Sequence, residues 1–337
     1  MITLFSQHPH SDLLFAHVDA ALARAGVESS HMRMEEYESM QGVIDAIPRG
    51  GALVVWNGME QRQIIETAQI CGMRIAYCEH GCIPHTTAID PMGVNARSSV
   101  AGLSASFLAR IPIDEEKMTA LASRPLFQRE LPKGVESTGY DDGLPLPASF
   151  VLLILQVYDD SQIKLLSPHY HTMGQLIDDV ARATAEIGIG LVIKAHSSDA
   201  GRADYLQRVR LYKHAQIRLT DSVEYLLSFC AHGVITINSG VGAEAMLRGH
   251  NVLVLGEAVY SPVCLSVLDG DTLTDAVRSL LKSPQATDFQ RRWLYYMYHH
   301  YLLPVWCFDP DADGCDAAAR RLVDISEGKL PWLTDIA

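Results

Sequence analysis

Short apolar runs alternate with amphipathic stretches along the first third of the chain. Apolar runs bounded by glycine, with helical periodicity between them, are typical of strands and helices that alternate around a parallel sheet. The pattern predicts strands within residues 2–6, 52–58 and 74–81 and helices within residues 13–26 and 61–72. This part of the chain is therefore predicted to consist of βα units.

The same alternation begins again near residue 150, after a stretch with little periodicity. Residues 125–148 contain four prolines and three glycines, a composition typical of a linker between domains. Beyond it, strands are predicted within residues 150–156, 190–196, 216–220, 233–239 and 251–256. Helices are predicted within residues 173–188, 203–213, 222–231, 272–282, 286–302 and 314–327.

Two Rossmann-like, doubly wound α/β domains that face each other across a cleft are the simplest architecture with this pattern. We expect the first domain, with the linker, to occupy residues 1–145 and the second to occupy residues 146–285. The helices of residues 286–337 are expected to pack across both domains.

Composition supports a large buried core and argues against one class of function. The 337 residues are 48% hydrophobic and 20% charged, which is enough for more than one core. The formal net charge of −13 argues against nucleic-acid binding along a broad basic face, because phosphate contacts need a local excess of Lys and Arg. A small anionic ligand, held by a few backbone amides and one or two cations, is compatible with this charge.

Cysteine usage and hydropathy favour a cytoplasmic protein. The seven cysteines have no regular spacing, which does not fit a disulfide framework and favours a reducing compartment. Residues 1–14 lack a basic segment followed by an apolar run, so no secretory signal is expected. No stretch approaches the ~18 to 20 apolar residues that span a bilayer, which leaves at most a peripheral contact with the inner face of the membrane.

A turn of small residues follows the strand predicted within residues 233–239. Asn238, Ser239, Gly240 and Gly242 separate this strand from a short helix. Ligands of open parallel sheets bind beyond the carboxyl ends of the strands, and small residues beside the free amides of a helix's first turn suit a phosphate. Glu244, one turn into the helix, could accept hydrogen bonds from a ribose. The structural alternative is that Ser239 caps the helix and the glycines permit close packing.

Polar side chains also follow two other apolar runs. Lys194 and His196 come directly after one strand and could neutralise a phosphate and stabilise the charge of a departing one. Gln156, Asp159 and Asp160 come after another, where one carboxylate could act as a nucleophile or general base. Since neighbouring side chains point in different directions, only one of the two aspartates is expected to face the chemistry. The alternatives are solvated side chains, or an aspartate that caps the next helix.

These three stretches, in this order, resemble the bacterial capsule polysaccharide biosynthesis family, whose characterised members are β-Kdo glycosyltransferases that use CMP-β-Kdo. The family pattern Gln-Val, two variable residues, Asp, one variable residue, Ser-Ile is matched at residues 156–163, with Gln162 in place of the Ser. The pattern Lys, one variable residue, His-Pro is matched at residues 194–197, with Ser197 in place of the proline. The family's Ser/Gly turn corresponds to residues 238–256.

The N-terminal half resembles the family more loosely, and the resemblance as a whole spans roughly residues 50–265. Residues 77–99 are similar to a family segment in which an acidic residue and a glycine are followed by an Asp-Pro-x-Gly turn. The positions carried over from it are Glu79, His80, Gly81, Asp90, Gly93 and Asn95.

The resemblance implies a glycosyltransferase-B type of fold in which the C-terminal domain holds CMP. The acceptor, a saccharide or a lipid-linked glycan, would approach from the N-terminal domain. Kdo transfer would need no metal or other cofactor, because the leaving phosphate is already an anion that cationic side chains and backbone amides can stabilise. The residues expected to bind the nucleotide sugar are Gln156, Lys194, His196, Asn238, Ser239, Gly240, Gly242 and Glu244.

The resemblance also implies catalytic roles. Retention of the β-linkage would proceed by double displacement, with Asp160 as the nucleophile that forms a covalent glycosyl-enzyme. His196 would stabilise the departing phosphate, and Glu79 or His80 would take the acceptor proton. The alternatives are a transferase or epimerase that uses a UDP-sugar or another CMP-sugar, and a non-catalytic assembly subunit with the same fold.

Three further signals favour structural interpretations. Cys78, His80, Cys82 and His85 are too compressed in sequence for a usual tetrahedral zinc site, so no metal site is expected. The run that begins at Asp309 resembles a calcium loop but carries Arg320 at its twelfth position, which favours a helix cap. The aromatic residues of 293–308 favour core packing over a membrane-surface helix whose Arg291 and Arg292 contact headgroups.

Overall fold

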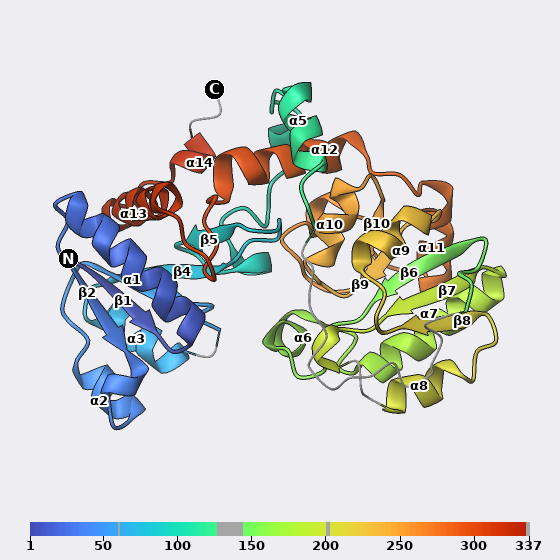
Figure 1. Ribbon diagram of the computed structural model, residues 1–337, viewed down its shortest axis with the longest axis horizontal. Coiled ribbons are helices and arrows are strands. Elements are labelled where there is room, and N and C mark those ends of the chain that lie inside the picture. The colour runs from blue at the N-terminus through green and yellow to red at the C-terminus, as the bar shows by residue number, and fades with distance from the viewer. Residues whose placement is uncertain (60, 127–143, 200–202, 335–337) are drawn as a thin grey trace. The chain divides into compact units, whose positions relative to one another are not determined.

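The computed structural model describes residues 1–59, 61–126, 144–199 and 203–334. The chain forms two compact units, unit 1 (Met1–Gly102 with Tyr296–Ala337) and unit 2 (Leu103–Tyr295), each an α/β body of its own (Figure 1). The units thus divide near residues 102 and 295, whereas the expected boundaries lie near residues 145 and 285. The expected domain ranges stay a prediction. The predicted linker of 125–148 falls mostly on residues 127–143, outside the described residues.

Within the described part of unit 1, five strands form a sheet in the order β2-β1-β3-β4-β5. β1 to β4 pair in parallel, and β5 pairs antiparallel with β4. The strand order changes direction between β1 and β3, which makes this pair the topological switch point of the sheet. The strands are β1 Ile2–Ser6, β2 Ser29–Arg33, β3 Ala52–Trp56, β4 Arg74–His80 and β5 Thr87–Asp90.

Helices cover both faces of the sheet of unit 1. α2 and α3 share one apolar core with the sheet, whereas α1 packs beside α13 and against β1 and β2 (Figure 1). The helices are α1 Pro9–Arg24, α2 Met40–Asp45, α3 Arg62–Ile70, the π-helix Met297–Tyr301, α13 Ala312–Glu327 and α14 Pro331–Thr334. Short 3-10 helices lie at Met34–Glu36 and Asn95–Arg97.

The buried strands of unit 1 agree with the prediction, and its two edge strands were missed. β2 reads Ser-Ser-His-Met-Arg, and among these residues only Met32 is buried, so the strand carries no apolar run. β5 is fully buried but begins with Thr87 and ends with Asp90, and its antiparallel direction departs from the expected parallel sheet. Both strands end the five-strand order, where such a composition and direction are tolerated. Among the described residues, the outer side of β5 makes only an isolated antiparallel bridge between Thr87 and Leu303.

A buried polar network ties the C-terminal segment to the sheet of unit 1. The Asp90 carboxylate accepts hydrogen bonds from the amide of Met92 (2.8 Å), from the amide and hydroxyl of Ser99, and from the hydroxyl of Tyr301 (3.1 Å). The Arg321 guanidinium lies 4.0 Å from the ring centroid of Trp332. Burial, with the Asp90 charge nearby, raises the pKa of Tyr301 and keeps its hydroxyl a donor. Asp90, one of the family positions, therefore has a structural role here.

Unit 2 is built on a second sheet, in which its described strands follow the order β10-β9-β6-β7-β8 and are all parallel. The switch point lies between β6 and β9. The strands are β6 Phe150–Ile154, β7 Gly190–Lys194, β8 Ala215–Arg218, β9 Val234–Thr236 and β10 Val252–Val254. These strands and the prediction of two Rossmann-like doubly wound units are confirmed.

Helices again lie on both faces of the sheet in unit 2. α7, α8 and α11 share one core with the strands, and α10 packs against β9 and β10. The helices are α4 Ala105–Leu108, α5 Glu115–Ala122, α6 Ser161–Leu166, α7 Met173–Ile187, α8 Ala203–Val209, α9 Val223–Phe229, α10 Val241–Leu247, α11 Leu273–Lys282 and α12 Asp288–Tyr296. Short 3-10 helices lie at Ser197–Asp199 and Ser261–Val263.

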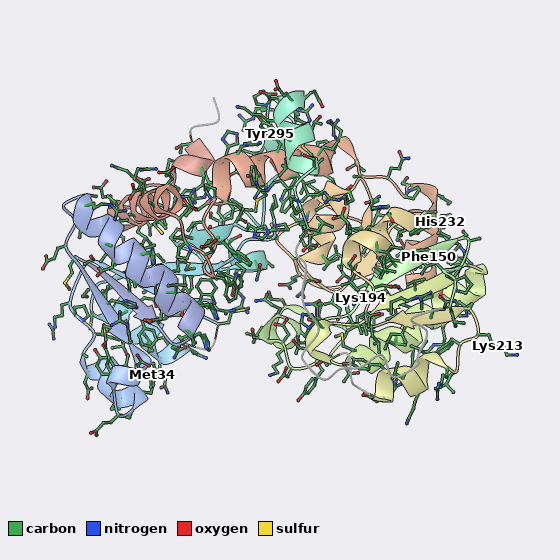
Figure 2. The ribbon with its side chains drawn as sticks, viewed as in Figure 1. Met34, Phe150, Lys194, Lys213, His232 and Tyr295 are labelled. Carbon is green, nitrogen blue, oxygen red and sulfur yellow. The ribbon has the colours of Figure 1, made fainter. Side chains whose placement is uncertain are left out.

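The strands of unit 2 end in register. Ile154 of β6 lies opposite Lys194 of β7 and Thr236 of β9, which in turn lies opposite Val254 of β10. Figure 2 labels Phe150, at the amino end of β6, and Lys194, at the carboxyl end of β7. The loops that follow these strands therefore start from one edge of the sheet.

Two of the structural interpretations are confirmed. Asp311 caps α13 through a hydrogen bond from the amide of Gly314 (2.7 Å). Trp293, Tyr296 and Tyr301 of the aromatic segment are fully buried in the cores. Among the described residues, no helix combines the length and the apolar character needed to cross a membrane.

We expect Asp90→Ala to destabilise the protein by about 3 kcal/mol, because the buried hydroxyl of Tyr301 and the partly buried donors of Ser99 lose their acceptor. Urea denaturation measures this change. The exposed Glu38, changed to Ala, serves as the control and should shift the free energy of unfolding by less than about 0.5 kcal/mol. Equal effects of the two substitutions would contradict the role given to Asp90.

Candidate active site

The site begins with two amide side chains at the switch point of unit 2. Gln156 follows β6 and Asn238 follows β9, and their side chains meet across the two strands. Gln156 Nε2 donates to Asn238 Oδ1 (2.8 Å), and Gln156 Oε1 accepts from the Asn238 backbone amide (3.1 Å). The Gln156 side chain is buried, so this pair satisfies polar groups that water cannot reach and fixes the two loops together.

Asp160 is linked to the same pair through the backbone of Gln162. Asn238 Nδ2 donates to the carbonyl oxygen of Gln162 (3.3 Å), and the amide of Gln162 donates to Asp160 Oδ1 (2.9 Å). Asp160 is the N-cap of α6, whereas Asp159 is exposed. The cap uses one carboxylate oxygen, so the capping alternative and a chemical role for the second oxygen are compatible.

The two glycines of the Ser/Gly turn have different surroundings. A Cβ at Gly242 would lie 2.5 Å from Cζ of Tyr260, whose hydroxyl donates to the Ser239 carbonyl oxygen. A Cβ at Gly240 would meet nothing within 4 Å. The missing side chain of Gly242 thus makes room for the protein's own Tyr260, and the open space of the turn lies at Gly240.

Most backbone amides of this turn already have acceptors within the chain. The amide of Ser239 donates to Thr236 Oγ1 (3.3 Å), that of Val241 to Ser239 Oγ (3.3 Å), and that of Gly242 to the Ser239 carbonyl oxygen (2.9 Å). The Ser239 hydroxyl thus accepts from the first amide of α10, but the N-cap residue of this helix is Gly240, so Ser239 precedes the cap and the structural alternative placed Ser239 one residue too far along. The turn offers an anion fewer amides than the sequence suggested.

Lys194 and His196 extend the same edge beyond β7. Lys194 Nζ donates to the carbonyl oxygen of Leu219 (2.6 Å), which fixes its ammonium beside the end of β8 (Figure 2). Nδ1 of His196 accepts from the amide of Ser198 (3.2 Å). Because Nδ1 is an acceptor, the hydrogen of a neutral His196 ring resides on Nε2.

Three further residues lie at this edge, and two of them, Asp199 and Tyr260, were not among the predicted site residues. The buried Asp199 accepts from the amide of Tyr158 (2.8 Å) and the hydroxyl of Tyr205 (3.3 Å), and so joins the loops after β6 and β7. The sequence signal was available, since Asp199 closes the polar run after β7. Tyr260 gave no such signal. Glu244 was predicted, and its residue is only 7% exposed.

The two departures from the family pattern fall where backbone atoms make the contacts. Gln162 replaces a Ser, yet its amide and carbonyl groups provide the links to Asp160 and Asn238. Ser197 replaces a proline at the first position of a 3-10 helix, a position that accepts either residue. Neither change removes a contact described here.

In unit 1, Glu79 and His80 end β4 at the carboxyl edge of that sheet. Glu79 Oε2 accepts from Asn57 Nδ2 (2.7 Å), and Oε1 accepts from the amide of His80 (2.9 Å). The His80 ring packs among other rings, and its Nδ1 lies 3.6 Å from Cys307 Sγ. Burial, with the Glu79 charge, raises the pKa of the Cys307 thiol to about 12, so this sulfur is protonated.

The other positions carried over from the family shape the backbone nearby. Gly81 has no room for a Cβ because the Thr86 side chain occupies the space. Gly93 has φ +155° and a Cβ there would lie 2.8 Å from Cβ of Arg97. Asn95 adopts φ 52° in the turn that follows. These residues support the loop and make no contact that indicates chemistry.

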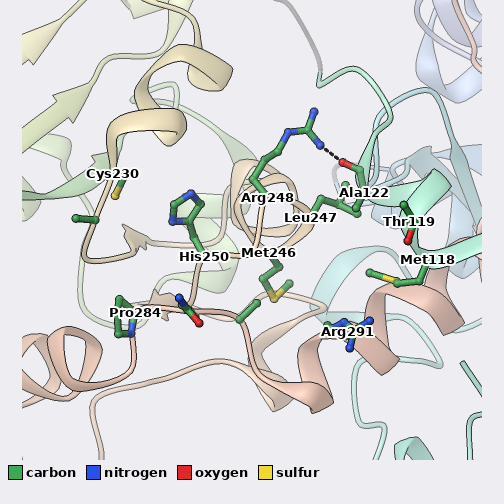
Figure 3. A pocket seen from close by; sticks show the side chains of 14 residues that line it. Met118, Thr119, Ala122, Cys230, Met246, Leu247, Arg248, His250, Pro284 and Arg291 are labelled. Atoms are coloured by element: carbon green, nitrogen blue, oxygen red, sulfur yellow. Dashed lines mark hydrogen bonds between the residues drawn. The ribbon is translucent and has the colours of Figure 1, made fainter. Parts of the chain in front are cut away.

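Cavities lie at both edges of the sheet in unit 2. One of about 460 Å³ opens beyond the carboxyl end of β10, lined by Leu255, Gly256 and His169 among others. A cavity of about 670 Å³ lies before the amino ends of β9 and β10; Figure 3 shows Arg248 there, donating to the Ala122 carbonyl oxygen. Burial lowers the pKa of His250 in this second cavity. Only the first lies on the edge of Asn238 and Asp160.

No group of three His, Cys, Asp or Glu side chains within the described ranges is arranged to hold a metal ion. The compressed Cys/His run of residues 78–85 is therefore not assembled into such a group.

Comparisons with known proteins identify the family of the chain. A family described as "Capsule polysaccharide biosynthesis protein" matches residues 133–303. Protein FixF of Sinorhizobium fredii is 29% identical over 82% of this chain, and the capsule polysaccharide modification protein LipB of Neisseria meningitidis is 27% identical over 44% of it. The chain covers 65% of the length of the first relative and 36% of the second.

Two solved structures resemble the whole chain. The β-Kdo 2,7 transferase and the β-Kdo 2,4 transferase of Thermosulfurimonas dismutans KpsC match 96% of this chain, with TM-scores of 0.57 and 0.55 and 15% and 16% identity. The matches cover 99% of the first of those chains and 97% of the second. At this identity the likeness concerns the fold, and it confirms the predicted glycosyltransferase-B type.

Substitution of Gly240 and Gly242 by alanine should show which of the two glycines lies in open space and which is packed against Tyr260. Gly242→Ala is expected to destabilise unit 2 by about 1 to 3 kcal/mol, because the new methyl group overlaps the Tyr260 ring. Gly240→Ala is the matched control: its φ of −54° suits alanine and its surroundings are open, so stability should stay within about 0.5 kcal/mol of wild type. Thermal denaturation of both variants measures the difference, and a stable Gly242→Ala protein would contradict this packing.

Proposed function

Because the chain belongs to the capsule polysaccharide biosynthesis family, as the sequence resemblance indicated, we propose that it is a glycosyltransferase of surface polysaccharide synthesis. The proposed donor is CMP-β-Kdo, and the proposed acceptor is a saccharide or a lipid-linked glycan. The reaction takes place in the cytoplasm or at the inner face of the membrane and uses no metal.

One observation carries the proposal: the hydrogen-bond chain that runs from Asp160 through Gln162 to Asn238 at the switch point of unit 2. Switch points are where open α/β sheets bind their ligands. These hydrogen bonds connect a carboxylate to the loop that carries the open space at Gly240, and a glycosyl donor needs both a nucleophile and such a space. The structural likeness to two β-Kdo transferases supports the same fold for this chemistry.

The first proposed step is displacement of CMP. An oxygen of Asp160 attacks the anomeric carbon of Kdo, the bond from that carbon to the phosphate oxygen breaks, and its electron pair leaves with CMP. The leaving phosphate is a weak base, so it needs charge stabilisation more than a proton. Lys194 and the Nε2 hydrogen of His196 supply that stabilisation.

The second proposed step returns the sugar to an acceptor. The acceptor hydroxyl oxygen attacks the same carbon, the bond to Asp160 breaks, and the acceptor proton passes to a base. Glu79 and His80 of unit 1 are the candidates for this base. Two displacements at one carbon retain the β configuration.

We expect Asp160→Asn to lower the transfer rate on the order of a thousand-fold or more, because an amide is not a nucleophile toward the anomeric carbon. Asn is as good an N-cap as Asp, so α6 and the binding of CMP should be preserved. Asp159→Asn, a change in the exposed neighbour, is the matched control and should keep wild-type activity. Product formation from CMP-Kdo, read by mass spectrometry, measures both variants; substantial transfer by Asp160→Asn would rule out this nucleophile.

The donor is tested by nucleotide-dependent thermal shift. A ligand at a hundred times its Kd stabilises the folded state by about 2.7 kcal/mol, a rise in Tm of a few degrees. We expect CMP to raise the Tm and UDP to leave it unchanged, with a smaller CMP effect in the Lys194→Met variant. A shift with UDP alone would favour the alternative of a UDP-sugar enzyme.

A further inference from the structure

Aromatic side chains gather at the switch point of the other sheet, in unit 1. His10 lies in the first turn of α1 directly after β1, and Trp56 is the last residue of β3. His80 is the last residue of β4, and Phe308 comes from the segment before α13. We refer to His10, Trp56, His80 and Phe308 as the ring cluster. Four chain segments thus bring their rings to the edge where a doubly wound sheet binds ligands.

The rings of this cluster are in mutual contact. His80 stacks on Phe308 with centroids 5.6 Å apart and planes 12° apart, and His10 lies 5.7 Å from His80 and 5.4 Å from Phe308. Trp56 meets both histidines edge-on at 5.0 Å. These are the separations of favourable aromatic pairs, so the rings hold one another in place.

Burial is graded across the ring cluster. Trp56 is only 6% exposed and packs against both histidines, whereas Phe308 is 51% exposed. Trp306 touches Phe308 edge-on at 5.3 Å. A large apolar ring that is held by its neighbours and still half open to solvent is arranged for contact with a further molecule.

The chemistry around the ring cluster favours a neutral, hydroxylated partner. Burial, with the charge of His8, lowers the pKa of His10, so this histidine is uncharged near neutral pH. The carboxylate of Glu79, the residue before His80, accepts hydrogen bonds from Asn57 and from the amide of His80. A carboxylate in this position repels anions and accepts hydrogen bonds from hydroxyl groups.

We propose that the ring cluster binds a pyranose ring of the acceptor saccharide, with one C–H face of the sugar stacked on Phe308 and its hydroxyl groups directed to Glu79. The weakly positive C–H groups of a pyranose complement the negative face of an aromatic ring. This inference rests on the proposed function for the name of the ligand as acceptor, but the binding itself requires neither donor nor turnover. A neighbouring cavity of about 320 Å³, lined by Asn57, Tyr77 and Arg97 among others, gives room for the next part of a glycan.

Saturation-transfer difference NMR on the full chain tests the proposal without a donor. The probes are the methyl glycosides of β-galactose, β-glucose, β-N-acetylglucosamine and α-rhamnose, with cytidine as a nucleobase probe. At least one glycoside should receive saturation, chiefly on the C–H protons of one face. The Phe308→Ala variant should weaken that binding about five-fold to ten-fold, the range for loss of one aromatic contact.

Two further variants control the experiment. Phe308→Trp keeps an aromatic face and should retain binding, and Phe229→Ala removes a similarly exposed ring (55%) from unit 2 and should have no effect. The proposal is overturned if no glycoside binds, if Phe308→Ala binds like wild type, or if cytidine is the probe that depends on Phe308. If the wild-type protein binds a glycoside but CMP does not raise its Tm, the result counts against the proposed donor and leaves the glycoside site standing.

Discussion

The mutual hydrogen bonds of Gln156 and Asn238 are the constraint on which the candidate site depends. Both side chains leave the ends of strands that lie next to each other at the switch point, and Gln156 is too deeply buried to be satisfied by water. Asn238 uses its remaining donor on the backbone beside Asp160, so one amide pair fixes both the carboxylate and the Ser/Gly turn. Any movement of one loop relative to the other would leave a buried polar group without a partner, a cost of about 1 to 3 kcal/mol. The geometry of the site is thus set by the need of these buried polar groups for hydrogen-bond partners.

Sequence patterns were sufficient to predict most strands of the parallel sheets. They were insufficient where the role of a residue depends on neighbours that are distant in the sequence. β6, β9 and most of β7 are apolar runs, so their positions and the polar residues that follow them could be predicted directly. β2 has no such run because it is an edge strand, and it was missed. The role of Gly242 depends on Tyr260, which lies beyond the next strand and whose ring no local pattern brings to the turn. The ring cluster is a stronger case, since residues 10, 56, 80 and 308 meet only in the folded chain.

The distinction between side-chain and backbone contacts also explains which family positions vary here. Gln156 and Asp160 contribute through their side chains, and each is present as the pattern requires. Positions 162 and 197 contribute through the backbone or through a helix start, and these two carry different residues. A substitution in such a motif is therefore informative only after the contacting atoms are known.

The division of unit 1 between two distant stretches of chain has a consequence for biogenesis. Its sheet is complete by residue 90, but α13, which packs beside α1 and against β4 and β5, is not synthesised until after residue 311. During translation one face of the sheet stays partly uncovered while the whole of unit 2 emerges from the ribosome. Contacts between residues so far apart in the sequence form slowly. Unit 2 is continuous in sequence and can fold during that interval. The nascent chain therefore exposes apolar surface of its first sheet longest, and chaperone dependence should be governed by that surface and by the time needed to reach the last helices.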